Sequence, residues 1–228
     1  MKNPLKQYVK KKRMEYHFHT GLKQLENDQP FPALKHGMHL IKIEPEFSGG
    51  YEILASAQEM LGEKEYAFKT LLEGLKKAPS SYLLQEKISV YYSDKDNFDL
   101  AFIAINKAID MAPNMPSLYF NKAIIFAKCN KFRDCAETLE YLINKVDDTF
   151  FDAYILQAQL LNNFEKPDLA IERMNVLVNG DLGRFGVPDL DELHKKIYET
   201  LIQSYQLKKD AEKEKYWKEK IECLGKKK

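Results

Sequence analysis

Apolar residues recur along this chain with the spacing of α-helices, and short polar turns separate them. Two stretches, AFKTLLEGLKKAP (67–79) and AFIAINKAIDMAP (101–113), share one shape, with small or apolar residues at positions i, i+4 and i+8. Residues spaced in this way lie on one face of a helix, so each stretch predicts a helix with a single buried face. Each stretch closes on proline, whose ring and missing N–H stop a helix. The copies start 34 residues apart (101 − 67 = 34), which predicts an internal repeat.

The repeat extends over most of the chain. One small residue marks the second helix of each copy, and these are Ala33, Ala67, Ala101, Cys135 and Ala170. The last step is one residue longer than the others (170 − 135 = 35). Twelve residues before each of them stands another small residue, namely Gly21, Ala55, Ser89, Ala123 and Ala158. Each copy is therefore predicted to hold two helices that approach closely at the small residues, with turns at 27–30, 62–65, 94–97, 130–131 and 164–167.

These positions recur in register and resemble the tetratricopeptide repeat, a helix–turn–helix unit of 34 residues. The resemblance covers residues 14 to about 178 and implies an all-α fold, a right-handed α-solenoid of tandem repeats. It departs from the family pattern where His17 and Gln85 replace the usual aromatic residue and where Asp147 replaces the fourth proline. Stacking of the copies is expected to form one continuous core, because neither helix of a copy can bury its apolar face alone.

The domain organisation follows from the repeats and from one break. Residues 1–178 are expected to form five repeats with a basic N-terminal helical extension, and residues 179–188 (NGDLGRFGVP) a glycine-rich linker. Residues 189–228 are expected to form a helical pair, either a degenerate sixth repeat or a cap. Its first helix would open with Asp189 as N-cap and run to about Gln206, and its second would carry Trp217 on an apolar face.

Charge and composition exclude several classes of protein. Residues 1–13 carry six basic side chains and no acidic one, residues 207–228 carry a net +4, and the total of +1 leaves −9 for the body (1 − 6 − 4 = −9). An acidic body argues against a nucleic-acid groove. No apolar run approaches the roughly 18–20 residues that span a bilayer, and no secretory signal follows the basic start. Three cysteines do not form a disulfide framework, so we expect a cytoplasmic protein.

Candidate catalytic and metal-binding chemistry is sparse. His17 and His19, with His36 and His39, form two closely spaced pairs in the first repeat. Zinc needs three or four converging ligands, and His17 stands at a packing position, so no metal is predicted. Cys135 replaces an alanine of the repeat and is predicted to pack as a small hydrophobe. Repeats account for nearly the whole chain and no catalytic motif stands out, so neither an enzyme nor a cofactor is expected.

The resemblance implies that a partner peptide or helix binds on a concave face lined by the first helices. The residues expected there are mostly apolar, with acids among them and Lys128 as the one opposing cation. The predicted groove consists of Phe18, Leu22, Glu52, Glu59, Glu86, Val90, Phe120, Asn121, Ile124 and Ile155. Such a groove favours an apolar or basic segment of another protein. The structural alternative is that Phe120 and Ile124 are buried against the neighbouring repeat.

One subfamily holds acidic chaperone tails in a carboxylate clamp, and its residues are absent here. Asn121 alone matches the pattern, while Asp152 and Leu156 occupy positions that the clamp reserves for cations. The function predicted first is therefore a non-catalytic scaffold or adaptor for a protein partner other than such a tail. A self-associating homo-oligomer is the second reading, and a nucleic-acid-linked regulator ranks last because no basic groove is present.

Overall fold

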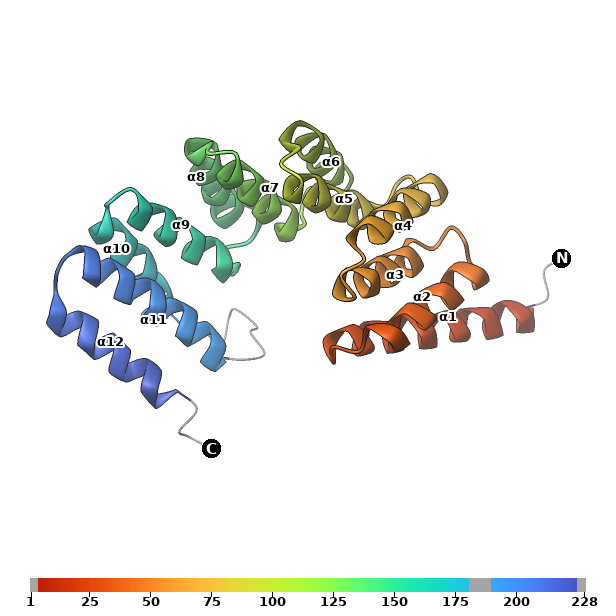
Figure 1. Cartoon of the computed structure of the whole chain (residues 1–228), viewed down its shortest axis with the longest axis horizontal. Coiled ribbons are helices and arrows are strands. Elements are labelled where there is room, and N and C mark those ends of the chain that lie inside the picture. Colours follow the sequence, from red (N-terminus) through yellow and green to blue (C-terminus); the bar gives the residue numbers. More distant parts are fainter. Residues whose placement is uncertain (1–3, 181–189, 225–228) are drawn as a thin grey trace. The chain divides into compact units, whose positions relative to one another are not determined.

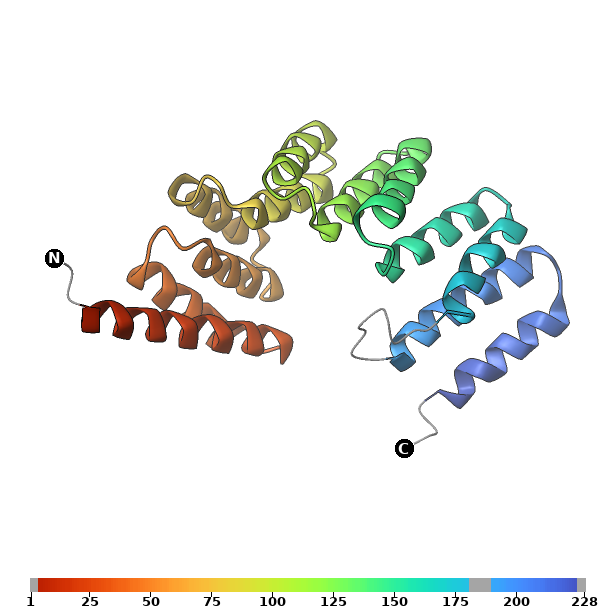
Figure 2. The same ribbon diagram turned by 180° about the vertical axis from the view of Figure 1, so that it is seen from behind.

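In the computed structural model, the described residues are 4–180 and 190–224, and helices form nearly all of this part of the chain, which contains no strand (Figure 1). The chain divides between Pro113 and Asn114 into two compact units. Unit 1 and unit 2 are described separately below. Within each unit, successive helices form antiparallel hairpins, as both Figure 1 and its reverse view, Figure 2, show. The prediction of an all-α solenoid of helical repeats is confirmed.

Unit 1 contains three hairpins. Its helices are α1 (Pro4–Glu26), α2 (Pro30–Ile43), α3 (Ser48–Met60), α4 (Lys64–Lys77), α5 (Tyr82–Asp94) and α6 (Phe98–Met111). Each helix packs against the next one along the chain, and the first helices of the hairpins also contact one another, α1 with α3 and α3 with α5. The first helices therefore share one side of the unit.

Unit 2 also contains three hairpins. Its helices are α7 (Pro116–Lys128), α8 (Phe132–Tyr141) continued by the π-helical turn η1 (Leu142–Val146), α9 (Phe151–Asn163), α10 (Pro167–Val178), α11 (Leu190–Leu207) and α12 (Ala211–Cys223). Most of the predicted linker 179–188 lies outside the described residues, as does Asp189 with its predicted capping role. The helix α11 ends at Leu207, one residue beyond the predicted end near Gln206, and α12 contains Trp217.

A left-handed residue closes the turn inside every hairpin. These residues are Asp28, Gly62, Asp96, Asn130, Glu165 and Lys209, each with a φ between 55° and 79°. The first four are spaced by 34 residues and the fifth follows after 35 (165 − 130 = 35). Gly, Asn and Asp adopt this conformation most readily, which is why polar turn residues at these points predicted the hairpins.

The π-helical turn explains the one irregular step of the repeat. The second helices α2, α4 and α6 have 14 residues each, whereas α8 and η1 together span the 15 residues Phe132–Val146. A π-helical turn inserts one residue into a helix without breaking it. The insertion keeps Leu142 and Ile143 both buried. The extra residue counted between Cys135 and Ala170 is thus absorbed within this helix.

The predicted small residues lie where helices approach. All ten of them are buried, Cys135 included, so the predicted packing role is confirmed: Gly21, Ala33, Ala55, Ala67, Ser89, Ala101, Ala123, Cys135, Ala158 and Ala170. In unit 1 the helices α2 and α3 come especially close. A Cβ atom at Gly37 would lie 2.8 Å from the Leu54 backbone nitrogen and 3.0 Å from the Gly50 carbonyl oxygen. Only a residue without a side chain fits there.

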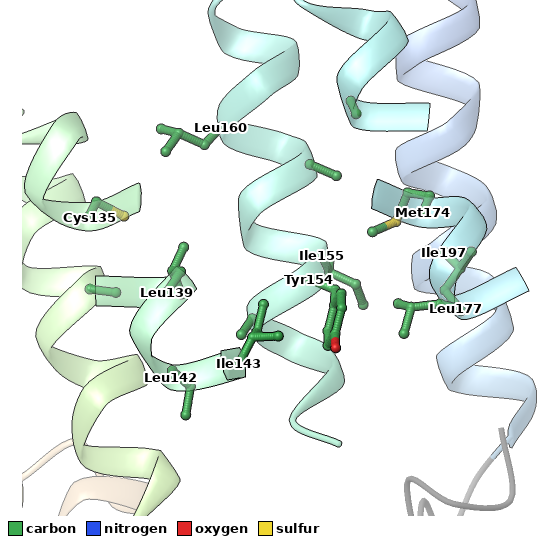
Figure 3. Packing of buried hydrophobic residues seen from close by; sticks show 14 of the residues in the cluster. Cys135, Leu139, Leu142, Ile143, Tyr154, Ile155, Leu160, Met174, Leu177 and Ile197 are labelled. Carbon is green, nitrogen blue, oxygen red and sulfur yellow. The ribbon is translucent and has the colours of Figure 1, made fainter. Parts of the chain in front are cut away.

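The core of unit 2 is one large apolar cluster. Figure 3 shows Met174 and Leu177 of α10 gathered with Tyr154 of α9 and Ile197 of α11 in the space between these helices. The cluster continues to Leu139 of α8, so it joins helices from several hairpins. A buried polar bridge reinforces it, in which the Ser204 hydroxyl donates to Asn162 Oδ1 over 2.9 Å.

The last helix covers α11. Trp217 is half-buried, packs against the unit 2 cluster and lies with its ring centroid 5.1 Å from that of Tyr198. The Asp210 carboxylate accepts the backbone N–H of Lys213 over 3.0 Å and caps the helix. Every described residue of α12 keeps some solvent exposure, as a terminal helix with a polar outer face would.

Candidate protein-interaction surfaces

The first helices of unit 2 form a groove. A cavity of about 330 Å³ opens along α7, α9 and α11, and we call it the unit 2 groove. Its lining combines apolar side chains with polar and charged ones: Phe120, Ile124, Asp152, Ile155, Leu156, Gln159, Lys196, Glu199, Thr200 and Gln203. Three predicted groove residues, Phe120, Ile124 and Ile155, come together here.

These three residues differ in how far solvent reaches them. Ile155 is 5% exposed and forms part of the floor. Phe120 is half-buried, packs against the core cluster and lies with its ring centroid 5.2 Å from that of Phe150. Ile124 is half-buried and lines the groove. Asn121, also half-buried on α7, is not among the lining residues of this cavity. Phe120 thus serves both the core and the groove.

Sequence reasoning missed the contribution of α11. Glu199 and Gln203 line the groove just as Ile155 and Gln159 do on α9. The position of the hairpin turn is the signal that could have revealed it. On α9, Ile155 and Gln159 flank position 158, which lies seven residues before the left-handed Glu165. On α11, Glu199 and Gln203 flank position 202, which lies seven residues before the left-handed Lys209. The other first helices have a small residue at this position, but α11 has Ile202. The pattern of small residues therefore does not continue into α11.

The unit 2 groove also contains an ion pair. Lys196 Nζ lies 3.5 Å from Asp152 Oδ1, and the same ammonium sits 5.8 Å from the Phe151 ring centroid. This pair joins α9 to α11. The position at which a carboxylate clamp would carry a cation is therefore an acid already bound to a lysine of the chain itself.

Unit 1 brings two predicted residues to a second cavity. Glu59 and Val90 line a space of about 260 Å³ together with Lys64, Tyr91, Asp94 and Lys95. Lys64 pairs with Asp94 at 3.9 Å, and Lys95 pairs with Glu65 at 2.7 Å. The expectation that Lys128 alone opposes the acids overlooked these lysines. Lys64 belongs to a second helix, and Lys95 follows the end of α5.

Glu52 and Glu86 occupy equivalent positions on α3 and α5, and we call them the acidic pair. Both side chains are half-buried. Burial raises the pKa of Glu52 above its ordinary value, the Glu86 charge raises that pKa further, and Lys87 opposes the shift. A carboxylate that is partly desolvated beside a like charge gains from a nearby cation. The acidic pair thus places partly desolvated negative charge on the first helices of unit 1.

Phe18 and Leu22 pack largely within unit 1. Both join the apolar cluster around Leu40 and Ile53, and the Phe18 ring lies edge-on to Phe47 with centroids 5.4 Å apart. Phe18 also lines a cavity of about 550 Å³, which has Lys10 and Lys11 at its edge.

Of the four histidines in the first repeat, His17, His36 and His39 meet between α1 and α2. The Nδ1 atoms of His17 and His36 are 2.9 Å apart, and the His39 ring centroid lies 4.9 Å from that of His17. Burial and the neighbouring histidines lower the pKa values of His17 and His36. His19 lies apart, beside Phe18. Across residues 4–180 and 190–224, no group of three or more His, Cys, Asp or Glu side chains is arranged to hold a metal ion.

Comparisons with known proteins agree with the repeat architecture. No family model matches the sequence, and no curated protein matches it. Solved structures do match. PilF of Pseudomonas aeruginosa has a TM-score of 0.72 at 12% identity, over 96% of this chain and 95% of that one.

Two further structures are tetratricopeptide repeat proteins by their own description. The one from Parabacteroides merdae has a TM-score of 0.68 at 17% identity, over 100% of this chain and 82% of that one. The one from Thermus thermophilus has a TM-score of 0.68 at 15% identity, over 83% of this chain and 99% of that one. At such identities the similarity concerns the fold. Together with the 34-residue period, it shows that the chain has the tetratricopeptide-repeat fold.

Proposed function

We propose that this protein is a non-catalytic scaffold whose first helices bind an apolar, basic segment of another protein. The observation that carries the proposal is the unit 2 groove along α7, α9 and α11, which contains Phe120 and Ile124 of α7 and Ile155 of α9. Phe120 and Ile124 are half-buried, and apolar side chains that stay partly exposed together in a groove are typical of interaction surfaces. Repeat folds of this kind present such surfaces for extended or helical peptides.

The charge preference comes from unit 1. Burial and the neighbouring Glu86 charge raise the free energy of the charged form of Glu52, against the effect of Lys87, and this favours a partner Lys or Arg beside the acidic pair. Charge complementarity governs selectivity and association rate more than affinity. On unit 1 the acidic pair would therefore select basic segments over acidic ones, and on unit 2 the apolar contacts of the groove would supply affinity.

A displayed library of random peptides, selected on the purified protein, tests the proposal. Bound peptides are expected to carry Leu or Phe beside Lys or Arg. Ile124→Ser is expected to weaken their binding by about fivefold or more, since truncating a groove anchor costs over roughly 1 kcal/mol. Glu86→Lys is expected to weaken binding chiefly at low salt, because screening reduces surface electrostatics.

The matched control is Val176→Ser. Val176 is 41% exposed and lies on α10, a second helix of the same unit. Binding that survives Ile124→Ser and Glu86→Lys but is lost in Val176→Ser would place the binding surface on the second helices and contradict the proposal. Light scattering on the same samples distinguishes peptide binding from self-association, which would require a dimer or larger species without peptide.

A further inference from the structure

The N-terminal half of α1 carries an apolar surface that packing leaves outside. Leu5, Tyr8, Val9 and Tyr16 are 68%, 60%, 48% and 62% exposed. Their spacing of three, four and eleven residues from Leu5 places them along one face of the helix. We call this face the outer stripe. The side chains by which α1 joins the core, such as Met14 and Phe18, belong to a different face.

The length of α1 makes this surface prominent. α1 has 23 residues, whereas the other first helices of unit 1, α3 and α5, have 13 each. Most of the outer stripe lies in the ten additional residues (23 − 13 = 10) at its N-terminal side. Figures 1 and 2 show α1 as the longest ribbon at that end of unit 1.

Basic side chains flank the outer stripe. Residues 4–14 contain five of them and no acidic residue: Lys6, Lys10, Lys11, Lys12 and Arg13. All five are exposed. At 100° per residue, Lys6 and Arg13 follow one side of the stripe, Lys11 the other, and Lys12 falls within it between Leu5 and Tyr8. Glu44 pairs with Lys10, and Glu15 pairs with Lys12 at 2.9 Å and with Lys11 at 4.0 Å. Five cations are thus accompanied by two carboxylates, so this surface has a net positive charge.

We propose that the outer stripe docks α1 on an anionic phospholipid surface. A helix with an apolar face between cations lies in the membrane interface with its apolar side toward the acyl chains. Tyrosines suit the headgroup level, because one end of the ring is apolar and the other polar. Long lysine chains let the ammonium reach the phosphates while the stem stays on the apolar side. Each such cation near an anionic leaflet contributes favourably.

Charge distinguishes lipid from a second copy of the chain. Pairing two α1 helices through their outer stripes would bring five cations of one copy near five of the other, and like charges disfavour such contacts. An anionic lipid surface neutralises all of them. Across the described part of the chain, no helix is long and apolar enough to cross a membrane, so the proposed attachment is peripheral.

The other terminal helix provides an internal contrast. α12 also exposes a tyrosine, Tyr216, at 45%. Its lysines are balanced by as many glutamates (Lys213, Lys215, Lys218 and Lys220 against Glu212, Glu214, Glu219 and Glu222). Several of these are paired, for example Lys218 with Glu214 at 2.6 Å. Exposed aromatic surface alone therefore does not single out α1, whereas its unbalanced positive charge does.

Sedimentation with vesicles tests the proposal on the full chain. Two kinds are used, phosphatidylcholine alone and phosphatidylcholine with phosphatidylserine at roughly a third of the lipid. Binding is expected to the second kind and to fall as salt rises. The pair Leu5→Ser with Val9→Ser, and separately Lys6→Glu with Lys11→Glu, are each expected to reduce vesicle binding by about tenfold or more.

Two matched controls come from α4 of the same unit. Tyr16→Ser is compared with Tyr66→Ser, since both tyrosines are 62% exposed, and only the first is expected to weaken binding. Lys76→Glu with Lys77→Glu changes charge as much as the α1 pair and is expected to leave binding unchanged. Melting curves of every variant confirm that unit 1 remains folded.

Several outcomes would overturn the proposal. One is absence of binding to the anionic vesicles, and another is equal loss from the α1 and α4 variants. Light scattering that shows a lipid-free dimer abolished by Leu5→Ser with Val9→Ser would assign the stripe to a second copy. Tight binding to a DNA duplex that needs the lysines but ignores Leu5→Ser with Val9→Ser would assign the basic surface to nucleic acid.

Discussion

The first hairpin of unit 1 and the hairpins of unit 2 have the same form but pack against the next hairpin differently. In unit 1, α2 and α3 approach so closely that Gly37 has no room for a Cβ atom. Among the buried apolar residues there, one cluster lies around Leu40 and a separate one around Leu71. In unit 2, large side chains such as Met174 and Tyr154 fill the space between helices, and one cluster joins α7 to α11.

The difference shows that one repeat pattern accepts two packing solutions. Where the residue four positions after the small alanine is glycine, as at Gly37, the backbones themselves make contact. Where it is Leu, Ile or Met, as at Met174, a side chain fills the gap. Protein interiors are close-packed in either case. A side chain should therefore destabilise the fold at a glycine contact such as Gly37, and loss of a large side chain should destabilise it at a filled position such as Met174. The predictions below test this, from the largest expected effect to the smallest.

The largest effect is expected in the unit 2 core. Met174 is 0% exposed, so Met174→Ala should lower the free energy of unfolding by about 2–5 kcal/mol through lost burial and the cavity left behind. Urea denaturation followed by circular dichroism measures it. Val176→Ala, two residues away and 41% exposed, should change the stability by less than about 0.5 kcal/mol. Equal effects of the two substitutions would show that Met174 does not carry the packing.

The glycine contact of unit 1 should resist the smallest added group. In Gly37→Ala the new Cβ would lie 2.8 Å from a backbone nitrogen of α3, which cannot move aside like a flexible side chain. We expect a loss of about 1–3 kcal/mol despite the better helix propensity of alanine. Met38→Ala, at a neighbouring site that is 56% exposed, controls for substitution in the same helix. A more stable Gly37→Ala variant would refute the close backbone packing.

The polar bridge of unit 2 should be worth somewhat less. Ser204→Ala leaves the buried Asn162 Oδ1 without its 2.9 Å donor, and an unsatisfied buried acceptor costs about 1–3 kcal/mol. Ser89→Ala in unit 1 is the matched control. Ser89 is equally buried but donates only within its own helix, to the Glu86 carbonyl at 2.6 Å, and alanine is the residue of the repeat at that position. If both substitutions proved neutral, the bridge between α9 and α11 would have no energetic role.

The smallest effect concerns pH and the histidines of unit 1. The pKa values of His17 and His36 are lowered in the folded protein by burial and by neighbouring cationic groups, including His39 and, for His17, Arg13. The unfolded chain therefore binds more protons as the pH falls below about 6.5, so stability should decrease in that direction. His17→Tyr, which restores the aromatic residue of other repeats, should make melting temperature less dependent on pH between about 7.5 and 5.5.

An unchanged pH slope in His17→Tyr would place the titrating groups elsewhere. His36→Gln should also make the melting temperature less dependent on pH, because Nδ1 of His36 lies 2.9 Å from Nδ1 of His17.

Much of the fold could be predicted from local spacing. The small residues, five of the six hairpin turns among the described residues and the additional residue before Ala170 were all visible in the sequence, because each depends on positions within one hairpin. The structure gave the additional residue a specific form, the π-helical turn Leu142–Val146. The groove was less predictable. Phe120 and Ile155 were placed among its residues, but the degree to which Phe120 also packs on Phe150 depends on how α7 lies against the segment before α9.

What the sequence by itself determined is therefore periodic: a chain of helix pairs, their turns, and the faces at which they touch. A helix face depends only on a spacing of three or four residues, which any window of the sequence reveals. What the tertiary structure decided is which side chains from different helices meet. The addition of Glu199 and Gln203 to the groove, the pairing of Lys64 with Asp94 and the contact of His17 with His36 all join separate helices. Such contacts depend on how helices cross and which rotamers fit, and no repeat position encodes them.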